Sequence, residues 1–186
     1  MRASHSKAND AEVVQVDFIS PVTIRKATIE DVEGIARCLE SAFEPFRPHY
    51  TPQAFRDTVP DPAAIRERMQ HMTIYAAISL QKEIVGTVAT AVQGEEGHLR
   101  GMAVEPAYHG LRIAERLLEE AENDLREAGC VRVTLDTTLP LQRAIRFYQK
   151  NGFAPSGKVT DFFGMPLYEY QKSLARQNPR RPQNSR

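Results

Sequence analysis

Apolar and polar positions along this chain follow two periods, and each period predicts a different kind of element. Where apolar residues alternate with polar ones, or where short β-branched runs lie between turn residues, the pattern predicts strands. Where apolar residues recur every three or four positions, it predicts helices with one buried face. The predicted strands cover residues 22–27, 73–79, 84–92, 98–104, 131–136, 153–156 and 167–174.

Three long helices are predicted between these strands. The clearest one covers about 110–128, where one face is apolar and Gly129 marks the C-terminal end. Thr28 and Asp31 have the spacing of a capping box, which predicts that another helix begins after Thr28. The third helix is predicted from about 140 to 150.

The segment from 43 to 62 breaks this periodicity, because it is rich in proline and aromatic residues. Thr51-Pro52 and Asp61-Pro62 predict the starts of two short helices, since proline suits the first helical position. A short turn at 80–83 is predicted to connect the two strands that follow.

Length and periodicity together predict one domain of the α/β (α+β) class. A chain of 186 residues is long enough for one substantial core, and no internal repeat divides it. We expect the domain to cover 21–174. The preceding segment, 1–20, is polar and expected to be flexible, although 13–18 is able to add an edge strand. The final segment, 175–186, is expected to be a disordered basic tail.

The composition excludes several classes of partner. The 24 basic residues balance the 24 acidic ones, so neither nucleic acid nor a membrane surface is expected as a partner. No apolar run is long enough to span a bilayer, and the first residues lack the apolar core of a signal peptide.

Cys38 and Cys130 lie in apolar stretches, which predicts buried free thiols in a cytoplasmic protein. The five histidines have no metal-site spacing, so no metal is expected.

The first candidate for chemistry is the loop between the strand that ends near Val104 and the longest helix. Its sequence, from Tyr108, is Tyr-His-Gly-Leu-Arg-Ile-Ala. Gly110 lets the backbone approach a ligand, and His109 and Arg112 add positive side chains. The first N–H groups of a helix are free and attract an anion, most often a phosphate. One glycine before a helix is more often a simple turn, so the loop alone leaves both interpretations open.

A second candidate lies at the end of the last predicted helix. Tyr148 falls on the apolar face of that helix, and Asn151-Gly152-Phe153 follows it. A tyrosine on such a face is usually a core residue. Its phenol, with an unperturbed pKa of about 10, is also able to protonate a leaving group of similar basicity. Position alone does not separate the two roles.

The order of these elements resembles the GNAT superfamily of acyl-CoA N-acyltransferases. That family has a loop pattern of Arg or Gln, two residues, Gly, one residue, and Gly or Ala, commonly with an extra Gly after the first position. Gly110 matches the extra glycine, and Ala114 matches the final small residue. Two positions depart from the pattern: His109 stands for Arg or Gln, and Arg112 stands for the second glycine.

The second motif is similar to the family's as well. The run from Ala144 to Tyr148 matches Ala-x-x-Phe/Leu-Tyr, and Gly152-Phe153 matches the Gly-Phe pair that follows. Leu141 occupies the place of an Asn that often precedes this motif. The resemblance covers about 22–174 and is strongest in the second half.

The resemblance implies the GNAT fold, a central mixed, mostly antiparallel sheet of six to seven strands with helices on both faces, in which strands four and five are splayed. It implies an N-acetyltransferase that moves an acetyl group from acetyl-CoA, its co-substrate, to a primary amine of a small molecule or amino acid by direct transfer. Tyr148 is then the expected general acid. The residues expected to bind acetyl-CoA are Met102, Ala103, Val104, His109, Gly110, Leu111, Arg112, Ile113, Ala114 and Glu115.

In that family the cofactor inserts between the splayed strands like an extra strand. The main chain of 102–104 is therefore expected to contact pantetheine and to supply the donor for the oxyanion. The general base is left open. Its candidates are Glu44, His49, Glu95, Glu96, His98, Asp136 and Asp161.

The acceptor is expected between the segment 43–55 and a loop at 158–165. Glu44 and Asp161 are expected to attract a cationic amine there. The aromatic residues expected to border it are Phe46, Tyr50, Phe55, Phe162 and Phe163.

Two other functions stay open at this stage. A protein or peptide N-acetyltransferase of the same fold would need an open groove instead of a closed pocket. A non-catalytic acyl-CoA-binding sensor is the other alternative, and the departures at His109 and Arg112 favour it while Tyr148 does not. The sequence allows a monomer or a homodimer.

Overall fold

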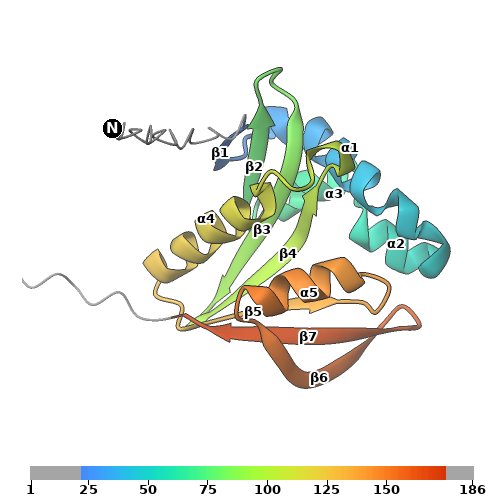
Figure 1. The fold of residues 1–186 in the computed structure, drawn as a ribbon, viewed down its shortest axis with the longest axis vertical. Helices are drawn as coiled ribbons and strands as arrows, with labels where there is room; N and C mark the ends of the chain where they lie inside the picture. Colours follow the sequence, from blue (N-terminus) through green and yellow to red (C-terminus); the bar gives the residue numbers. More distant parts are fainter. Residues whose placement is uncertain (1–21, 175–186) are drawn as a thin grey trace, which may run out of the picture.

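The computed structural model describes residues 22–174, drawn as a coloured ribbon in Figure 1. The predicted segments 1–20, 13–18 and 175–186 lie outside the described residues. The strands are β1 (Val22–Lys26), β2 (Thr73–Ser79), β3 (Ile84–Gln93), β4 (Glu96–Val104), β5 (Arg132–Thr137), β6 (Ala154–Phe162) and β7 (Met165–Ser173). The α-helices are α1 (Val32–Phe43), α2 (Pro52–Thr58), α3 (Pro62–Arg68), α4 (Ile113–Glu127) and α5 (Gln142–Lys150), and the 3₁₀ helices are η1 (Ile29–Asp31), η2 (Glu44–His49) and η3 (Pro106–Tyr108).

The strands form one seven-stranded sheet in the order β1-β2-β3-β4-β5-β7-β6. Neighbouring strands are antiparallel except β4 and β5, which are parallel. A long helix, α4, connects these two strands, as a parallel connection requires. The mixed, mostly antiparallel sheet expected from the sequence is confirmed.

The helices cover both faces of this sheet. Apolar residues of α4 and α5 form one core with the sheet, and those of α1 and α3 form a second core on the opposite face. Strand β2 shows the alternation directly, because Tyr75 and Ala77 belong to the first core while Ile74 and Ala76 belong to the second. Figure 1 shows α4 crossing the strands in front of the sheet, with α5 lying over β5 and β7.

Strands β4 and β5 pair only over the first four residues of each. The register joins Glu96–Leu99 to Arg132–Leu135, and no pairing follows, although β4 continues to Val104. The pairing of β4 with β3 also shifts register in this region, and Gly101 there has a φ of +59°. The splay expected of strands four and five is therefore present and begins after Leu99.

Two element boundaries differ from the sequence prediction. The longest helix begins at Ile113 instead of 110, because Gly110 and Arg112 adopt positive φ values of +86° and +57° that a helix cannot contain. The loop expected at 158–165 is mostly strand, since β6 and β7 form a hairpin around Phe163 and Gly164. Strand β6 is exposed over most of its length, so its apolar residues carry no clear periodicity.

Local signals at other helix starts are confirmed. The N–H of Thr28 donates to Asp31 Oδ2 at 2.7 Å, as the capping-box spacing predicts. Thr51 accepts from the N–H of Ala54, so α2 begins at the expected threonine-proline pair. Cys38 and Cys130 are buried free thiols. In the part of the chain described, helices are too short or too polar to cross a membrane.

Helix α4 lies close to the backbone of β4 at Gly97. A Cβ atom at this position would stand 2.5 Å from Leu125 Cδ1 and 2.6 Å from Leu125 Cδ2. Leu125 is fully buried, so its side chain has no free space to move into. The missing side chain at Gly97 thus sets how closely α4 packs on the sheet.

We expect Gly97→Ala to lower the free energy of unfolding by about 1–3 kcal/mol, because it overpacks this contact. Urea denaturation of the purified variants measures the effect. The matched control is the double variant Gly97→Ala/Leu125→Ala, whose loss should be smaller than the sum of the two single losses. Additive losses would contradict the contact.

Candidate functional site

Two adjoining cavities lie where β4 and β5 part. The first, which we call the loop pocket, encloses about 350 Å³ between the end of β4, the loop before α4, and α5. The second, the hairpin pocket, encloses about 340 Å³ between the middle of β4 and the β6–β7 hairpin. Four residues line both cavities, so the two spaces share a wall. These are Phe43, Asp136, Thr137 and Leu141.

Strand β4 passes from one pocket to the other. His98 to Gly101 line the hairpin pocket, and Met102 to Val104 line the loop pocket. The change falls at the register shift beside Gly101, whose φ of +59° is open to glycine without steric cost. Because β5 has already turned away, the edge of β4 that faced it is free of strand pairing in this stretch.

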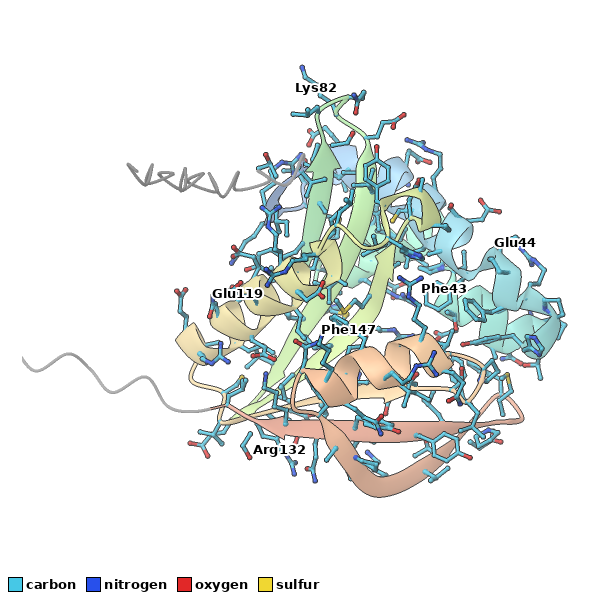
Figure 2. All side chains as sticks on the ribbon, in the orientation of Figure 1. Phe43, Glu44, Lys82, Glu119, Arg132 and Phe147 are labelled. Carbon is cyan, nitrogen blue, oxygen red and sulfur yellow. The ribbon has the colours of Figure 1, made fainter. Side chains whose placement is uncertain are left out.

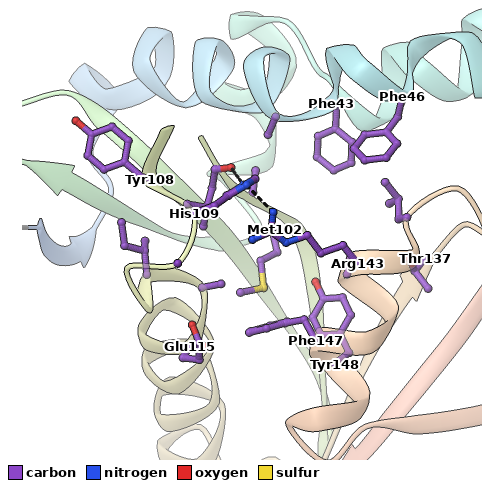
Figure 3. Close-up of a pocket in the computed structure, with 18 of the residues that line it drawn as sticks. Phe43, Phe46, Met102, Tyr108, His109, Glu115, Thr137, Arg143, Phe147 and Tyr148 are labelled. Atoms are coloured by element: carbon purple, nitrogen blue, oxygen red, sulfur yellow. Dashed lines mark hydrogen bonds between the residues drawn. The ribbon is translucent and has the colours of Figure 1, made fainter. Parts of the chain in front are cut away.

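The loop pocket gathers nearly all of the residues selected from the sequence. Leu111 is the exception, since its side chain is exposed and does not line the cavity. The predicted residues on its wall are Met102, Ala103, Val104, His109, Gly110, Arg112, Ile113, Ala114, Glu115 and Tyr148. Figure 3 shows His109, Met102 and Tyr148 around the same space although they come from three different segments.

The backbone of the loop presents a row of free donors. The first helical hydrogen bond of α4 runs from the N–H of Arg116 to the carbonyl of Arg112. The N–H groups of residues 110–115 donate to no acceptor among the described residues. They lie at the positive end of the helix dipole, so together they form a site for an anion.

Arg112 stands where the family pattern has its second glycine, and its backbone explains that preference. Its φ of +57° is in the left-handed region, where an L side chain costs about 1–2 kcal/mol. The loop therefore keeps the backbone shape that a glycine would adopt freely. An added Cβ at Gly110 would meet nothing within 4 Å, so the space beside this residue is open.

Both ring nitrogens of His109 contact neighbouring groups. Its Nε2 lies 2.9 Å from the carbonyl of Val104, and its Nδ1 lies 2.8 Å from Arg143 Nη1. The arginine can only donate, so Nδ1 accepts, and Nε2 carries the proton that Val104 accepts. The imidazole thus links β4 to Arg143, which the sequence did not single out and which is a second cation at this wall beside Arg112.

Tyr148 combines the two roles that the sequence left open. Its ring is buried and stands edge-on to Phe147 and Phe153, with centroids 5.4 and 5.6 Å away. Its hydroxyl points toward the space of the loop pocket in Figure 3. Burial raises the pKa of this phenol far above its ordinary value, so the hydroxyl keeps its proton at neutral pH.

The hairpin pocket lies where two distant segments meet. Thr51 Oγ1 donates to the carbonyl of Phe163 at 3.0 Å, and the N–H of Thr51 donates to Met165 Sδ at 3.4 Å. Tyr50 Oη lies 2.6 Å from Thr138 Oγ1. The first two bonds join the start of α2 to the β6–β7 hairpin, and the third joins Tyr50 to the residue that follows β5.

The expected acceptor residues divide between several places. Tyr50, Phe162 and Phe163 line the hairpin pocket, Phe46 lines the loop pocket, and Phe55 is buried against Tyr50. The two acidic residues expected there line neither pocket, which corrects that expectation.

Those two carboxylates have local partners instead. Glu44 lies on the outer surface and pairs with Arg47 at 2.7 Å (Figure 2). Asp161 accepts from the N–H of Gly164 and so closes the hairpin turn. Neither is available to attract an amine into the site.

Among the candidate bases, the structure brings together two. His98 Nε2 lies 3.7 Å from Asp136 Oδ2, and His98 Nδ1 lies 3.0 Å from Thr134 Oγ1. Burial lowers the pKa of His98, with Asp136 opposing that shift, and burial raises the pKa of Asp136. Both side chains line the hairpin pocket, and Asp136 also faces the loop pocket.

The remaining candidate bases lie outside the two cavities. Glu96 forms an ion pair with Arg132 at the start of β4. His49 is at the exposed end of η2. Glu95 precedes β4, and like these two it lines neither pocket.

Thr137 is a residue that sequence reasoning missed. It is 3% exposed, and its Oγ1 is the one buried side-chain polar atom without a hydrogen-bond partner in the described range. Thr137 lines both pockets at their shared wall. A buried hydroxyl without a partner is costly, so it indicates a ligand atom at this wall. A threonine at a strand end carries no sequence signal for such a role.

Comparison with known proteins gives a consistent result. The acetyltransferase (GNAT) family model matches residues 33–153. The chain is 34% identical over 82 residues to an IAA acetyltransferase of Azospirillum brasilense, which covers 44% of this chain and 54% of that protein. It is 25% identical over 147 residues to an aminoalkylphosphonate N-acetyltransferase of Salmonella typhimurium, covering 75% of this chain and 90% of that protein.

A solved structure shares the fold. The PaiA N-acetyltransferase of Thermoplasma acidophilum, in complex with coenzyme A, superposes with a TM-score of 0.66 at 21% identity. The match covers 82% of this chain and 98% of that one. The first curated relative, by contrast, is matched over only about half of its length.

We expect the imidazole pKa of His98 to lie below that of an ordinary histidine, because burial disfavours its charged form. Asp136→Asn should lower it further, since this carboxylate favours the imidazolium. An NMR titration of the His98 ring measures both. The control is Asp61→Asn, which changes the N-cap of α3 and should leave the pKa of His98 unchanged. An unchanged or raised pKa in Asp136→Asn would contradict the pairing.

Proposed function

The chain belongs to the GNAT family of acetyltransferases, and we propose that it transfers an acetyl group directly from acetyl-CoA to a primary amine of a small molecule or amino acid. One observation carries this proposal. The free N–H groups of residues 110–115, the unpaired edge of β4 and the Tyr148 hydroxyl all face one cavity. An anion site, an extended-ligand edge and a proton donor are the parts that a thioester of coenzyme A requires.

We assign acetyl-CoA to the loop pocket. The N–H groups of 110–115 suit a diphosphate, with Arg112 and Arg143 as cations at the same wall. The main-chain groups of 102–104 then face the pantetheine. Leu111 contributes its N–H only, because its exposed side chain does not line the cavity. The unit 21–174 carries all of these residues.

We assign the acceptor to the hairpin pocket and the reaction to the shared wall. The amine nitrogen forms a bond to the thioester carbonyl carbon as the carbon–sulfur bond breaks. The proton lost by the amine goes to His98, which Asp136 orients, and Tyr148 donates a proton to the departing thiolate. A main-chain N–H of 102–104 and the hydroxyl of Thr137 are the donors available to the carbonyl oxygen.

The hydrogen bonds that border the hairpin pocket favour a small molecule over a peptide. Hydrogen bonds join Thr51 to Phe163 of the hairpin and Tyr50 to Thr138 after β5, and these contacts would have to part to admit an extended chain. The acceptor named for one relative, an aminoalkylphosphonate, is also a small amine. Both observations support an acceptor that enters a pocket.

We expect Tyr148→Phe to lower kcat by about 10²-fold or more, because the variant removes the proton donor for the thiolate and keeps the core ring. Release of coenzyme A from acetyl-CoA, followed with a panel of primary amines, measures the effect. Tyr168→Phe removes a phenol hydroxyl outside both pockets and should keep the wild-type kcat.

Two results of this experiment would contradict the proposal. If the wild type binds acetyl-CoA and no amine accelerates the release of coenzyme A, the sensor alternative replaces the enzyme. If Tyr148→Phe keeps the wild-type kcat, the proton comes from another group.

We expect Gly110→Glu to weaken acetyl-CoA binding about tenfold or more, because it sets a carboxylate against the proposed diphosphate. Gly157→Glu is the matched control. Its φ of +88° resembles the +86° of Gly110, and a Cβ at either position meets nothing within 4 Å, so the backbone strain is comparable. Calorimetry that gave equal affinities for the two variants would overturn the assignment of the loop.

A further inference from the structure

We infer that the hairpin pocket contains an anion subsite, and that the acceptor is a short primary amine carrying a carboxylate or phosphonate group. The subsite is formed by Arg68 and Arg100. This inference rests on the proposed function, because it specifies the class of amine that the hairpin pocket accepts.

Three elements bring these charges together. Arg68 ends α3, Arg100 lies in β4, and both guanidinium groups meet Asp57 of α2. Arg100 Nη2 lies 2.5 Å from Asp57 Oδ2, and Arg68 Nη2 lies 3.6 Å from Asp57 Oδ1. Arg68 Nη2 also donates to the carbonyl of Asp57 at 2.7 Å. All three side chains line the hairpin pocket.

The cluster has one more positive charge than negative charge. Two guanidinium groups share the single carboxylate of Asp57, and the side chain of Arg68 is only 19% exposed. Burial and the nearby Arg100 both lower the pKa of Arg68, with Asp57 opposing that shift. A guanidinium has five N–H donors in a planar fork, so donors remain for an anionic oxygen.

The opposite end of the hairpin pocket has no excess of positive charge. There His98 and Asp136 form the pair described above, with a neutral imidazole beside a carboxylate. The wall thus has a positive end at Arg68 and Arg100 and a neutral-to-negative end at the proposed reaction centre. Such a pocket matches a molecule with an anion at one end and an amine at the other.

The positions of His98 and Arg100 on one strand favour a short molecule. His98 and Arg100 are two residues apart on a regular stretch of β4, paired with Ala91 and Ala89 of β3. Their side chains therefore project from the same face, and their Cα atoms are about 7 Å apart along the strand. After one hydrogen bond at each end, the space left suits an amine and an anion separated by a few bonds.

Matched acceptors test the inference with the 186-residue chain. The probes are 3-aminopropanoate, its neutral amide 3-aminopropanamide, and 2-aminoethylphosphonate, which keep a similar amine-to-headgroup spacing. The readout is the ratio of kcat/KM for each acid to kcat/KM for the amide. We expect this ratio to exceed about ten for at least one acid, and comparison of the two acids distinguishes a carboxylate from a phosphonate.

Variants of opposite charge change this ratio in opposite directions. We expect Arg100→Gln to lower it about tenfold or more, because a charge-assisted bond to the acid is lost. Asp57→Asn should raise it, because the carboxylate that competes for the two guanidinium groups is removed. The control is Arg66→Gln, which removes an α3 arginine that pairs with Glu33 outside the pocket and should leave the ratio as in the wild type.

The outcomes separate this inference from the proposed function. If the wild type acetylates the amide and both acids with equal kcat/KM, and Arg100→Gln does not change the acid-to-amide ratio, the anion subsite is wrong. The acetyltransferase activity would then still stand. A protein that binds acetyl-CoA and acetylates none of the amines would remove the proposed function itself.

Discussion

The parting of β4 from β5 is the constraint on which the rest of the site depends. Backbone groups in a sheet need partners, and after Leu99 the parallel pairing that supplied them to β4 stops. The strand nevertheless continues to Val104, held from the other side by β3. One strand therefore lines two cavities in turn, with the register shift at Gly101 between them. Without the splay, the space that both pockets share would be filled by sheet.

Helix α4 places its positive N-terminal end at this opening. Its apolar face packs on β2, β3 and β4, and the close contact at Gly97 fixes its distance from the sheet. Its N-terminus, with free N–H groups, consequently points at the mouth of the loop pocket, while its C-terminus lies beyond the start of β5 (Figure 1). Helix α5, packed in the same core, brings Tyr148 to the opposite wall. The apolar core therefore orients the polar groups of the site.

Charge is distributed unevenly over the two pockets. Backbone donors, Arg112 and Arg143 face the loop pocket, and the arginines of α3 and β4 face the far end of the hairpin pocket. Between these two charged regions lie His98, its partner Asp136 and the Thr137 hydroxyl, which has no hydrogen-bond partner among the described residues. In the function that we propose, this distribution holds an activated acyl donor and an anionic acceptor at opposite ends while the reacting atoms meet in between. Holding two reactants in this way contributes about 7–11 kcal/mol to catalysis in favourable cases.

The sequence by itself determined the elements and the parts of the site that repeat a local pattern. Proline after threonine or aspartate set the starts of α2 and α3, apolar spacing set α4, and the motif ending in Tyr148 identified a residue that lines the loop pocket. Strand β6 was predicted too short, because it is exposed along most of its length. Only the tertiary structure decided which charged residues meet. Asp57, Arg68 and Arg100 come from three elements, and His98 reaches Asp136 across the β4–β5 pair. Periodicity records which face of an element is buried, whereas the meeting of side chains from separate elements depends on how those elements pack.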